Sequence, residues 1–405
     1  MNKKNIEHYF DWAATSPADE DILRAALEDT IATWGNPSSM HTLGKKAKNM
    51  LEQARASCAY SLGVSPETIF FTSGGTESNH IPLLSILNRP QKGTILISTI
   101  EHPSVMQQAQ ELTKCGWQVT QIPATADGII TPEAVLAKLT NDTVLVCVMA
   151  VNNETGAIQP IYEIADALSQ AAGTRRRAKL HVDCVQAAGK IPLTISYAGI
   201  DSAAFSAHKI CGPRGIGIVY LADSIAPFLR GGGQENGIRS GTENLFGACA
   251  FAKCLSRYYI NGKNTDAYSD FMEQHNSSAM SRFELQKKLT KSFIEKLAAI
   301  QSCAIIPEAR TERMHEDKYS PWIVQAAFKN IPGQVMLRAL DAEGFAISTG
   351  SACSSRKNNR PVLEAMHVPT ALQENAVRFS FGPHTTEQAM QELVEKITQI
   401  VKTFT

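Results

Sequence analysis

Seven short apolar runs recur between residues 38 and 221, and stretches with helical periodicity separate most of them. The runs are 69–72, 94–98, 119–122, 144–151, 179–183, 203–206 and 215–220. The helical stretches are 44–62, 77–87, 103–114, 132–139 and 160–171. Nearly continuous apolar runs indicate strands that are buried on both faces. The alternation predicts an α/β fold: a mostly parallel sheet sandwiched by helices, with ligands at the C-terminal ends of its strands.

The pattern changes after residue 260. Residues 260–282 are polar and poor in β-branched side chains, which predicts a connection or a surface insertion. The charged stretch 307–320 predicts a loop, whereas 283–297 has helical periodicity. Three further runs have the composition of strands: 324–328, 345–347 and 376–381.

A chain of 405 residues is too long for one ordinary hydrophobic core. We therefore expect two domains. The large α/β domain is predicted at 15–262, and a smaller α+β domain is predicted from 1–14 together with 263–405.

Composition excludes several classes of function. Lys+Arg and Asp+Glu both number 39, so the net charge is zero, which argues against a nucleic acid or an anionic membrane as the main partner. No apolar run approaches the length of a membrane span, and the N-terminus lacks the apolar core of a signal peptide. The nine cysteines include no C-x-x-C pair, which favours reduced thiols over disulfides or a zinc site. We expect a cytoplasmic protein.

The turn at 72–78, Thr-Ser-Gly-Gly-Thr-Glu-Ser, follows a predicted strand and opens a predicted helix. Glycines allow close approach of the backbone, and the free N–H groups at a helix start suit a phosphate. The turn is neither a Walker A loop nor a dinucleotide fingerprint, because G-K-[ST] and G-x-G-x-x-G are absent. A simple tight turn between strand and helix is an equally good interpretation.

Asp183 and Lys209 each follow a buried strand. An aspartate in that position either caps a helix or pairs with a cation, such as the protonated nitrogen of a pyridine ring. Burial lowers the pKa of a lysine and frees its amine to form a Schiff base, although most lysines are solvated. The presence of Asp183 on the preceding strand favours a catalytic role for Lys209.

Three further side chains are candidates for a functional role: His102, Cys353 and Arg378. His102 follows the run 94–98 and could stack on a flat cofactor or serve a structural role. Cys353 lies among small residues, and the basic residues Arg356, Lys357 and Arg360 that follow could favour its thiolate, unless it is merely an accidental loop thiol. A guanidinium within a strand, as at Arg378, usually pairs with a carboxylate of the protein or of a substrate.

Taken in order, these segments resemble the cysteine desulfurases, which are fold-type-I, class-V aminotransferase enzymes that use pyridoxal phosphate. The resemblance starts at 9–15, Tyr-Phe-Asp-Trp-Ala-Ala-Thr, includes 34–39, Trp-Gly-Asn-Pro-Ser-Ser, and continues almost to the C-terminus. The segment around Cys353 is similar to the subgroup with a long active-site loop. That subgroup serves iron–sulfur cluster assembly and nitrogen fixation.

The resemblance implies a role for each residue of a pyridoxal 5'-phosphate site. Lys209 would be the Schiff-base lysine, Asp183 would pair with the pyridine nitrogen, and His102 would stack on the ring. Asn153 and Gln186 would lie near the ring hydroxyl. The phosphate would be held by residues that this chain and the other subunit of a homodimer provide: Gly75, Thr76, Ser206 and His208, with Thr242 from the other subunit.

The resemblance also implies the substrate and the reaction. Arg378 would bind the carboxylate of L-cysteine, with Asn36 and Asn153 nearby. Lys209, or alternatively His102, would remove the α-proton, and the Cys353 thiolate would attack the substrate sulfur. L-Alanine would leave, and the persulfide on Cys353 would pass to an acceptor or scaffold protein. No resident metal is implied, although Cys353 could transiently contact an iron–sulfur cluster.

Two alternatives remain open at this point. One is a selenocysteine lyase or another class-V aminotransferase; an aminotransferase needs no loop thiol. The other is a non-catalytic sulfur-relay scaffold, which would be expected to lose Lys209, Asp183 and Arg378, yet all three are present. Cys184 is a departure, because relatives often carry alanine there, and it is either a packing residue or a second thiol of interest.

Overall fold

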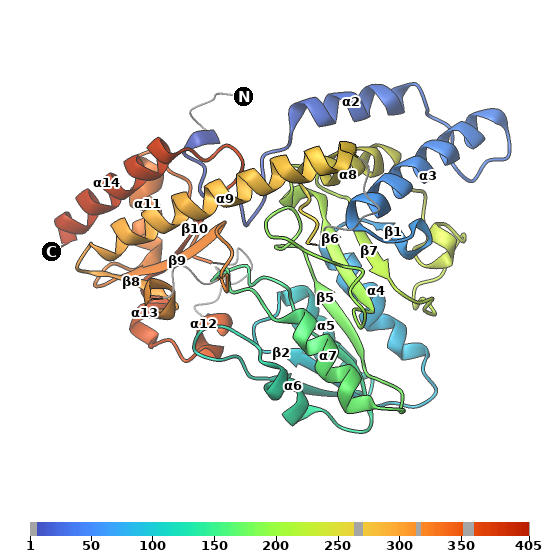
Figure 1. Ribbon diagram of the computed structural model, residues 1–405, viewed down its shortest axis with the longest axis horizontal. Helices are drawn as coiled ribbons and strands as arrows, with labels where there is room; N and C mark the ends of the chain where they lie inside the picture. Colours follow the sequence, from blue (N-terminus) through green and yellow to red (C-terminus); the bar gives the residue numbers. More distant parts are fainter. Residues whose placement is uncertain (1–5, 263–269, 313–316, 351–359, 405) are drawn as a thin grey trace.

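The computed structural model describes residues 6–262, 270–312, 317–350 and 360–404. In those residues the strands form two sheets, a seven-stranded sheet with the order β1-β7-β6-β5-β4-β2-β3 and a three-stranded sheet with the order β10-β9-β8 (Figure 1). The strands of the larger sheet are β1 Ile69–Thr72, β2 Thr94–Ser98, β3 Gln118–Ile122, β4 Thr143–Cys147, β5 Lys179–Asp183, β6 Ser202–Ser206 and β7 Gly217–Leu221. The helices around it are α2 Glu20–Ile31, α3 Thr42–Leu62, α4 Gly75–Ser85, α5 Pro103–Lys114, α6 Pro132–Lys138, α7 Ile161–Ala172 and α8 Leu245–Tyr258.

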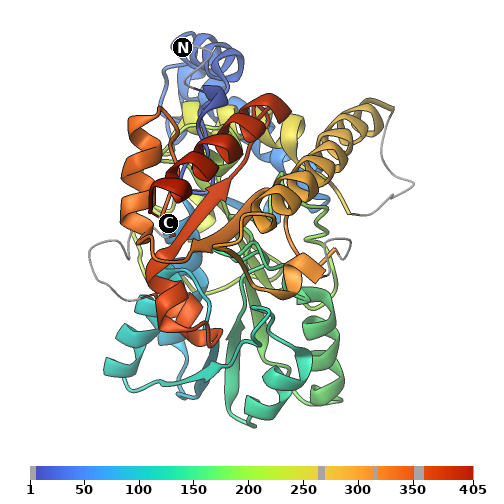
Figure 2. The same cartoon turned by 90° about the vertical axis from the view of Figure 1, so that its left-hand side faces the viewer.

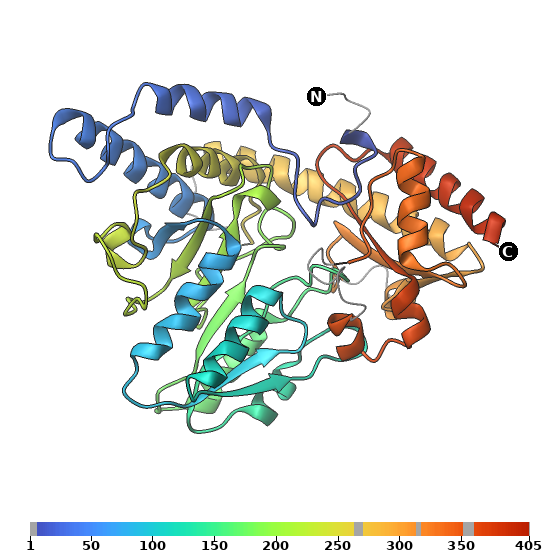
Figure 3. The same ribbon diagram turned by 180° about the vertical axis from the view of Figure 1, so that it is seen from behind.

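The larger sheet is parallel except at β7, which is antiparallel to both β1 and β6. Apart from the largely exposed edge strand β3, its strands are buried on both faces, because successive side chains point to opposite sides and helices cover both sides. In β2, Ile95 and Ile97 pack in the layer that holds α4 and α5, whereas Leu96 packs in the layer that holds α3, α7 and α8. Helices α4 and α5 lie in front of the sheet when the molecule is seen from behind (Figure 3). The predicted α/β fold with a mostly parallel, sandwiched sheet is confirmed.

The three-stranded sheet is antiparallel and has its own apolar cluster. Its strands are β8 Cys303–Ile306, β9 Ile323–Phe328 and β10 Ala376–Ser380. The helices of this part are α9 Asp270–Ala298, α10 Ala309–Glu312, α11 Gly333–Ala342, α12 Pro361–Ala365, α13 Thr370–Asn375 and α14 Glu387–Phe404. Figure 2 looks onto this sheet with α9, α11 and α14 around it. In α14 the residues Met390, Leu393 and Ile397 form the buried stripe, as the 3.6-residue period requires.

Two segments connect the two sheets. Near the N-terminus, Phe10 and Ala13 pack in the cluster of the smaller sheet, while the Ser16 backbone N–H donates to the His208 carbonyl beyond β6. Helix α9 contributes Phe283 to the core of the larger sheet and Phe293 to the smaller one. The separate clusters support the predicted division into 15–262 and 1–14 with 263–405, which stays a proposal.

Three predictions about local structure are wrong. The second half of the polar stretch 260–282 belongs to α9, because a polar sequence that is poor in β-branched residues suits an exposed helix. The run 345–347 forms isolated bridges instead of a strand, since it is too short to pair beyond Ala346 and Ser348. The charged stretch 307–320 contains α10, while 313–316 lies outside the described residues.

No helix among the described residues has the length and apolar character needed to traverse a bilayer. In the same part of the chain, no cluster of His, Cys, Asp or Glu side chains has the arrangement of a metal site.

A buried ion pair fastens the glycine-rich loop at 231–244 to α3. Arg55 donates from both terminal nitrogens to the two carboxylate oxygens of Glu235, each at 2.7 Å, and the Phe71 backbone N–H donates to the same carboxylate at 2.6 Å. The Glu235 backbone has a φ of 48° and Asn236 one of 53°, a region that costs energy for residues other than glycine. The ion pair therefore holds a strained loop in place.

Glu235→Ala is expected to lower the free energy of unfolding by about 3–5 kcal/mol, because it leaves the Arg55 guanidinium buried without its carboxylate. Chemical denaturation followed by circular dichroism measures the change. Glu111→Ala is the matched control, since Glu111 pairs with Lys114 on an exposed surface and its loss should cost roughly 0.5 kcal/mol or less. Equal effects for the two variants would contradict a structural role for the Arg55–Glu235 pair.

Candidate active site

The C-terminal ends of the parallel strands open into a cavity of about 220 Å³. Ten residues predicted from the sequence line it, all from the described part of the chain: Gly75, Thr76, His102, Asn153, Asp183, Gln186, Ser206, His208, Lys209 and Arg378. Nine of them end or follow strands of the larger sheet, and Arg378 comes from β10 of the smaller one. The cavity therefore depends on both sheets.

Lys209 ends a short 3-10 helix, Ala207–Lys209, that follows β6 directly. This turn folds back so closely that a Cβ on Gly212 would lie 2.7 Å from the Ala207 side chain. The Lys209 amine points into the cavity and donates to the carbonyls of Ala13 and Ala14, at 2.6 and 2.7 Å. The N-terminal segment thus holds the Lys209 amine in place. No sequence pattern predicts this contact between Lys209 and residues 13–14.

Asp183 ends β5 and is 4 % exposed. One carboxylate oxygen accepts from the Val185 backbone N–H at 2.9 Å, and the other accepts from the Asn79 side-chain amide at 2.8 Å. Both roles considered for this aspartate, local cap and partner of a cation, are therefore compatible with its surroundings.

Asn79 connects Asp183 to two more side chains that the sequence analysis missed. Its amide nitrogen also donates to Ser104 Oγ at 2.8 Å, and its oxygen lies 2.9 Å from Nε2 of His181. Burial lowers the pKa of His181 to about 3, so its imidazole is neutral. The one available signal was the position of Asn79, one helical turn beyond the glycine-rich turn on α4.

His102 caps α5. Its Nδ1 accepts from the Ser104 backbone N–H at 3.2 Å and lies 2.8 Å from Ser104 Oγ, and Pro103 occupies the first helical position. Burial lowers the pKa of His102, the Asp183 charge opposes that shift, and Lys209 adds to it. The ring is therefore held in the neutral form with its orientation fixed by Ser104. Beside it, burial raises the pKa of Glu101 to about 8.

The first turn of α4 forms the other end of the cavity. Its N-cap is Gly74, so no side chain in the described structure caps the N–H groups of this turn. A Cβ on Gly75 would lie 2.7 Å from Cγ2 of Val185, so only glycine keeps this approach open. Ser206 and His208 line the cavity here as well. Free N–H groups at a helix start bind phosphate oxygens well.

Arg378 enters the cavity from β10 with 2 % exposure. It donates to Asp11 Oδ1 and to the Asn153 carbonyl, both at 2.8 Å, while its Nε is buried without a partner among the described residues. A guanidinium that lines a cavity suits a carboxylate ligand. Asp11 offsets the charge of Arg378.

Comparison with known proteins decides the family. The model of the family described as "Aminotransferase class-V" matches residues 8–393. The chain belongs to the class-V aminotransferase family. Its cavity, which combines a lysine amine, an aspartate and an uncapped helix start, fits the pyridoxal phosphate on which these enzymes depend.

Some relatives are named cysteine desulfurases, and others are named NifS-like proteins. The NifS/IcsS protein homolog of Lactobacillus delbrueckii subsp. bulgaricus is 35% identical over 402 residues, which cover 98% of this chain and 97% of that protein. Cysteine desulfurase IscS of Dictyoglomus turgidum is 31% identical, with 98% and 95% covered. A solved NifS-like protein has a TM-score of 0.84 and 31% identity, and the match covers 98% of this chain and all of that one. Within class V, the chain therefore groups with the cysteine desulfurases.

Two predicted site residues in the described part of the chain, Asn36 and Thr242, do not line the cavity, and a third, Cys353, is not among the described residues. Asn36 is exposed, and its side chain accepts from the Ser38 backbone N–H at 2.9 Å. Thr242 is exposed on the loop that follows Glu235, so the phosphate role predicted for it requires a second subunit. Cys353 lies outside the described residues. The roles assigned to these three residues stay predictions.

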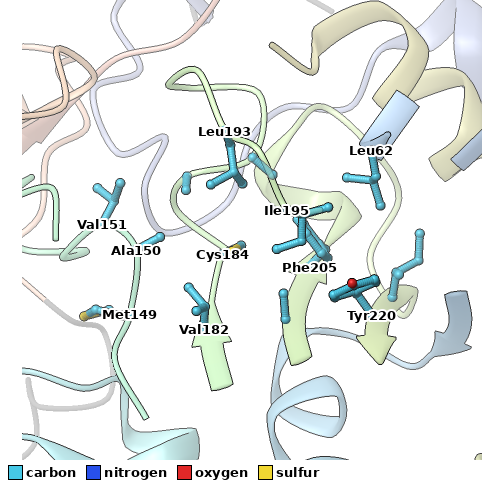
Figure 4. Packing of buried hydrophobic residues seen from close by; sticks show 14 of the residues in the cluster. Leu62, Met149, Ala150, Val151, Val182, Cys184, Leu193, Ile195, Phe205 and Tyr220 are labelled. Atoms are coloured by element: carbon cyan, nitrogen blue, oxygen red, sulfur yellow. The ribbon is translucent and has the colours of Figure 1, made fainter. Parts of the chain in front are cut away.

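Cys184 is a packing residue. It is fully buried in the apolar cluster beside Val182, Leu193 and Phe205 (Figure 4). Burial raises the pKa of its thiol well above the usual value. Among the eight cysteines in the described structure, Cys115 is exposed and Cys303 is partly buried, while the others are buried, as predicted for small core residues. Because its thiol is not accessible to reactants, Cys184 is not a second reactive thiol.

Proposed function

We propose that this chain removes sulfur from L-cysteine, releases L-alanine and carries the sulfur as a persulfide on Cys353. One observation supports this most strongly. The Lys209 amine, the Asp183 carboxylate and the Arg378 guanidinium come from segments far apart in the sequence and line one cavity. They provide an amine, an anion and a cation, which are the three groups that a cofactor aldehyde, a pyridinium nitrogen and an amino acid carboxylate need.

Each residue then has a distinct task. Pyridoxal phosphate, when bound, supplies an electron sink that stabilises the negative charge formed at Cα. Asp183 would keep the ring nitrogen of the cofactor protonated, and His102, neutral and oriented by Ser104, would hold the ring. Arg378, which lines the cavity from β10, binds the substrate carboxylate. Lys209 moves the proton at Cα.

Sulfur transfer requires a thiolate. The Cys353 thiolate attacks the substrate sulfur, so that an S–S bond forms while the Cβ–S bond breaks and its electron pair stays on carbon. A proton then completes the methyl group of L-alanine. The protein keeps a persulfide, which we propose passes to an acceptor protein for iron–sulfur cluster or other sulfur-cofactor biosynthesis. The reduced thiols of the described cysteines support a cytoplasmic location.

The test is a product balance. Purified protein with pyridoxal phosphate, L-cysteine and a thiol reductant should release L-alanine and sulfide in equal amounts. The same protein given L-alanine and a 2-oxo acid should form no new amino acid, since an aminotransferase would do so. L-Selenocysteine serves as a third substrate. Amino transfer to the 2-oxo acid, or turnover of selenocysteine alone, would overturn the proposal.

We also propose that the chain forms a homodimer and that Thr242 reaches the cavity of the other subunit. Large apolar side chains are exposed on the hairpin formed by α2 and α3, at the upper right of Figure 1: Leu27, Ile31, Trp34, Met40 and Leu43. Trp34 is 74 % exposed and Met40 is 88 % exposed, which is unusual for side chains of this size. The Arg55–Glu235 pair ties the loop of Thr242 to the same helix. The hairpin and the loop would therefore enter one interface.

The double variant Trp34→Asp with Met40→Asp is expected to be monomeric, because two charges would be buried in the interface. In the monomeric double variant, Thr242 of the other subunit no longer reaches the phosphate. Pyridoxal phosphate binding should therefore weaken roughly tenfold, the effect of one hydrogen bond to a charged group. Analytical ultracentrifugation and cofactor titration measure the two effects. Phe404→Asp is the control, since this exposed side chain lies at the end of α14, at the other end of the molecule. A dimeric double variant would refute the interface.

A further inference from the structure

A second lysine lies buried beside the cofactor cavity, and the reaction proposed above does not use it. Lys190 is 6 % exposed and follows β5 at the end of the turns that carry Gln186. The two residues are four positions apart in a segment with helical turns, so their side chains lie on one face. The Lys190 amine donates to Gln186 Oε1 at 2.5 Å.

The Gln186 amide is held at both of its ends. Its Oε1 accepts from Lys190, and its Nε2 donates to the Ala13 carbonyl at 2.8 Å. An amide nitrogen has two N–H groups, and the Ala13 carbonyl uses one. The Ala13 carbonyl also accepts from Lys209, so Gln186 and Lys209 share one backbone oxygen, and Lys190 contacts the other end of the Gln186 amide.

In the described structure, the side chain that accepts from the Lys190 amine is Gln186. The ionisable groups that face it are Lys209, Arg378 and Cys211, and His208 lies close enough to sense its charge. Burial lowers the pKa of Lys190 well below the usual value, and Lys209 and Arg378 lower it further. Charged or neutral, the amine keeps N–H groups that satisfy Oε1 of Gln186.

The main chain of Lys190 is also fixed. Trp322, which precedes β9 of the smaller sheet, donates from its indole nitrogen to the Lys190 carbonyl at 2.6 Å. Lys190 and Lys209 together line a second, small cavity of about 30 Å³. A lysine held at both its backbone and its amine is well placed to fix a neighbouring side chain.

We propose that Lys190 is a positioning residue of the cofactor site: it binds Oε1 of Gln186, so that Gln186 presents an N–H donor to the cofactor. This inference rests on the proposed function, because Gln186 is expected to lie near the ring hydroxyl of pyridoxal phosphate. That oxygen becomes negatively charged in the bound cofactor and needs a donor. Without Lys190, Oε1 would be buried without a partner and would turn toward the donors in the cavity.

Loss of this contact should change the proton affinity of the nitrogen that joins Lys209 to the cofactor. This change can be measured without turnover. A donor that stabilises the negative ring oxygen lowers the proton affinity of the nitrogen that joins Lys209 to the cofactor. Loss of this donor raises that affinity. Lys190→Met should therefore shift the pH midpoint of the visible absorption change upward by about one unit, the effect of one charged hydrogen bond. Methionine has a similar length and keeps the packing.

A double-mutant cycle separates an effect through Gln186 from a general one. Gln186→Leu alone should shift the midpoint as much as Lys190→Met, and the two together should shift it no further. Lys190→Arg, which keeps the donors, should stay within about 0.3 units of the natural protein. Lys179→Met is the matched control, because Lys179 is a lysine on β5 that pairs with Asp201 and Asp223 and lies outside the cavity.

The outcomes distinguish the two proposals. If the natural protein has no visible absorption that Lys209→Ala removes, the proposed function fails. If that absorption is present but Lys190→Met titrates like the natural protein, only the role of Lys190 is refuted. Additive shifts in the double variant would also refute it, since they would show that Lys190 acts without Gln186.

Discussion

Replacing Lys209 with alanine is expected to reduce alanine formation from L-cysteine by roughly 10⁴-fold or more, because one amine both binds the cofactor and moves the α-proton. The visible absorption of the lysine-bound cofactor should disappear at the same time. Alanine has no side-chain amine, so the hydrogen bonds to the Ala13 and Ala14 carbonyls are also lost. Spectra recorded with added pyridoxal phosphate, together with an alanine assay, measure both effects.

Lys179→Ala is the control for a general loss of a lysine, and it should retain both the absorption and the activity. A small amine added to Lys209→Ala should restore part of the rate, because free amine can take the place of the missing proton carrier. Full activity of Lys209→Ala without added amine would place the chemistry at another residue.

Replacing Cys353 with alanine is expected to leave the visible absorption intact and to lower sulfide release by roughly 10³-fold or more, since the substrate sulfur loses its nucleophile. Cys353 lies outside the described residues, so this prediction rests on the sequence and the family. Mass spectrometry before and after addition of L-cysteine should show a gain of one sulfur atom in the natural protein and none in the variant.

Cys115→Ala is the matched control, because Cys115 is an exposed cysteine in the described structure and lies at the end of α5. It should gain sulfur and release sulfide like the natural protein. The persulfide step would be refuted if Cys353→Ala kept full activity. Loss of the visible absorption in that variant would instead show that Cys353 is needed for the cofactor site itself.

The N-terminal segment has a larger role in the site than its position in the chain indicates. Ala13 and Ala14 accept from Lys209, and Asp11 accepts from Arg378. Phe10 packs in the core of the smaller sheet. The segment therefore brings contacts from both sheets to one cavity and contacts both the Arg378 guanidinium and the Lys209 amine.

Much of the larger sheet followed from local pattern alone. Runs of apolar residues that alternate with helical periods specify buried parallel strands, and β1, β2 and β5 begin and end at the predicted residues. The same pattern placed Asp183 and Lys209 at strand ends, where parallel sheets bind ligands. Periodicity predicted the second half of α9 at 283–297 but missed its polar start, which gives no apolar stripe. It also failed for 345–347, which pairs at single residues.

The amino-acid sequence by itself determined the alternating sheet, the strand-end positions of the cofactor residues and the family resemblance, because these depend on neighbours along the chain. Only the tertiary structure decided that Asn79 and His181 support Asp183, that the Ala13 carbonyl joins Gln186 to Lys209, and that Lys190 is buried behind them. These contacts join residues up to 196 positions apart. Packing in three dimensions brings these partners together, so the local sequence around each residue does not predict them.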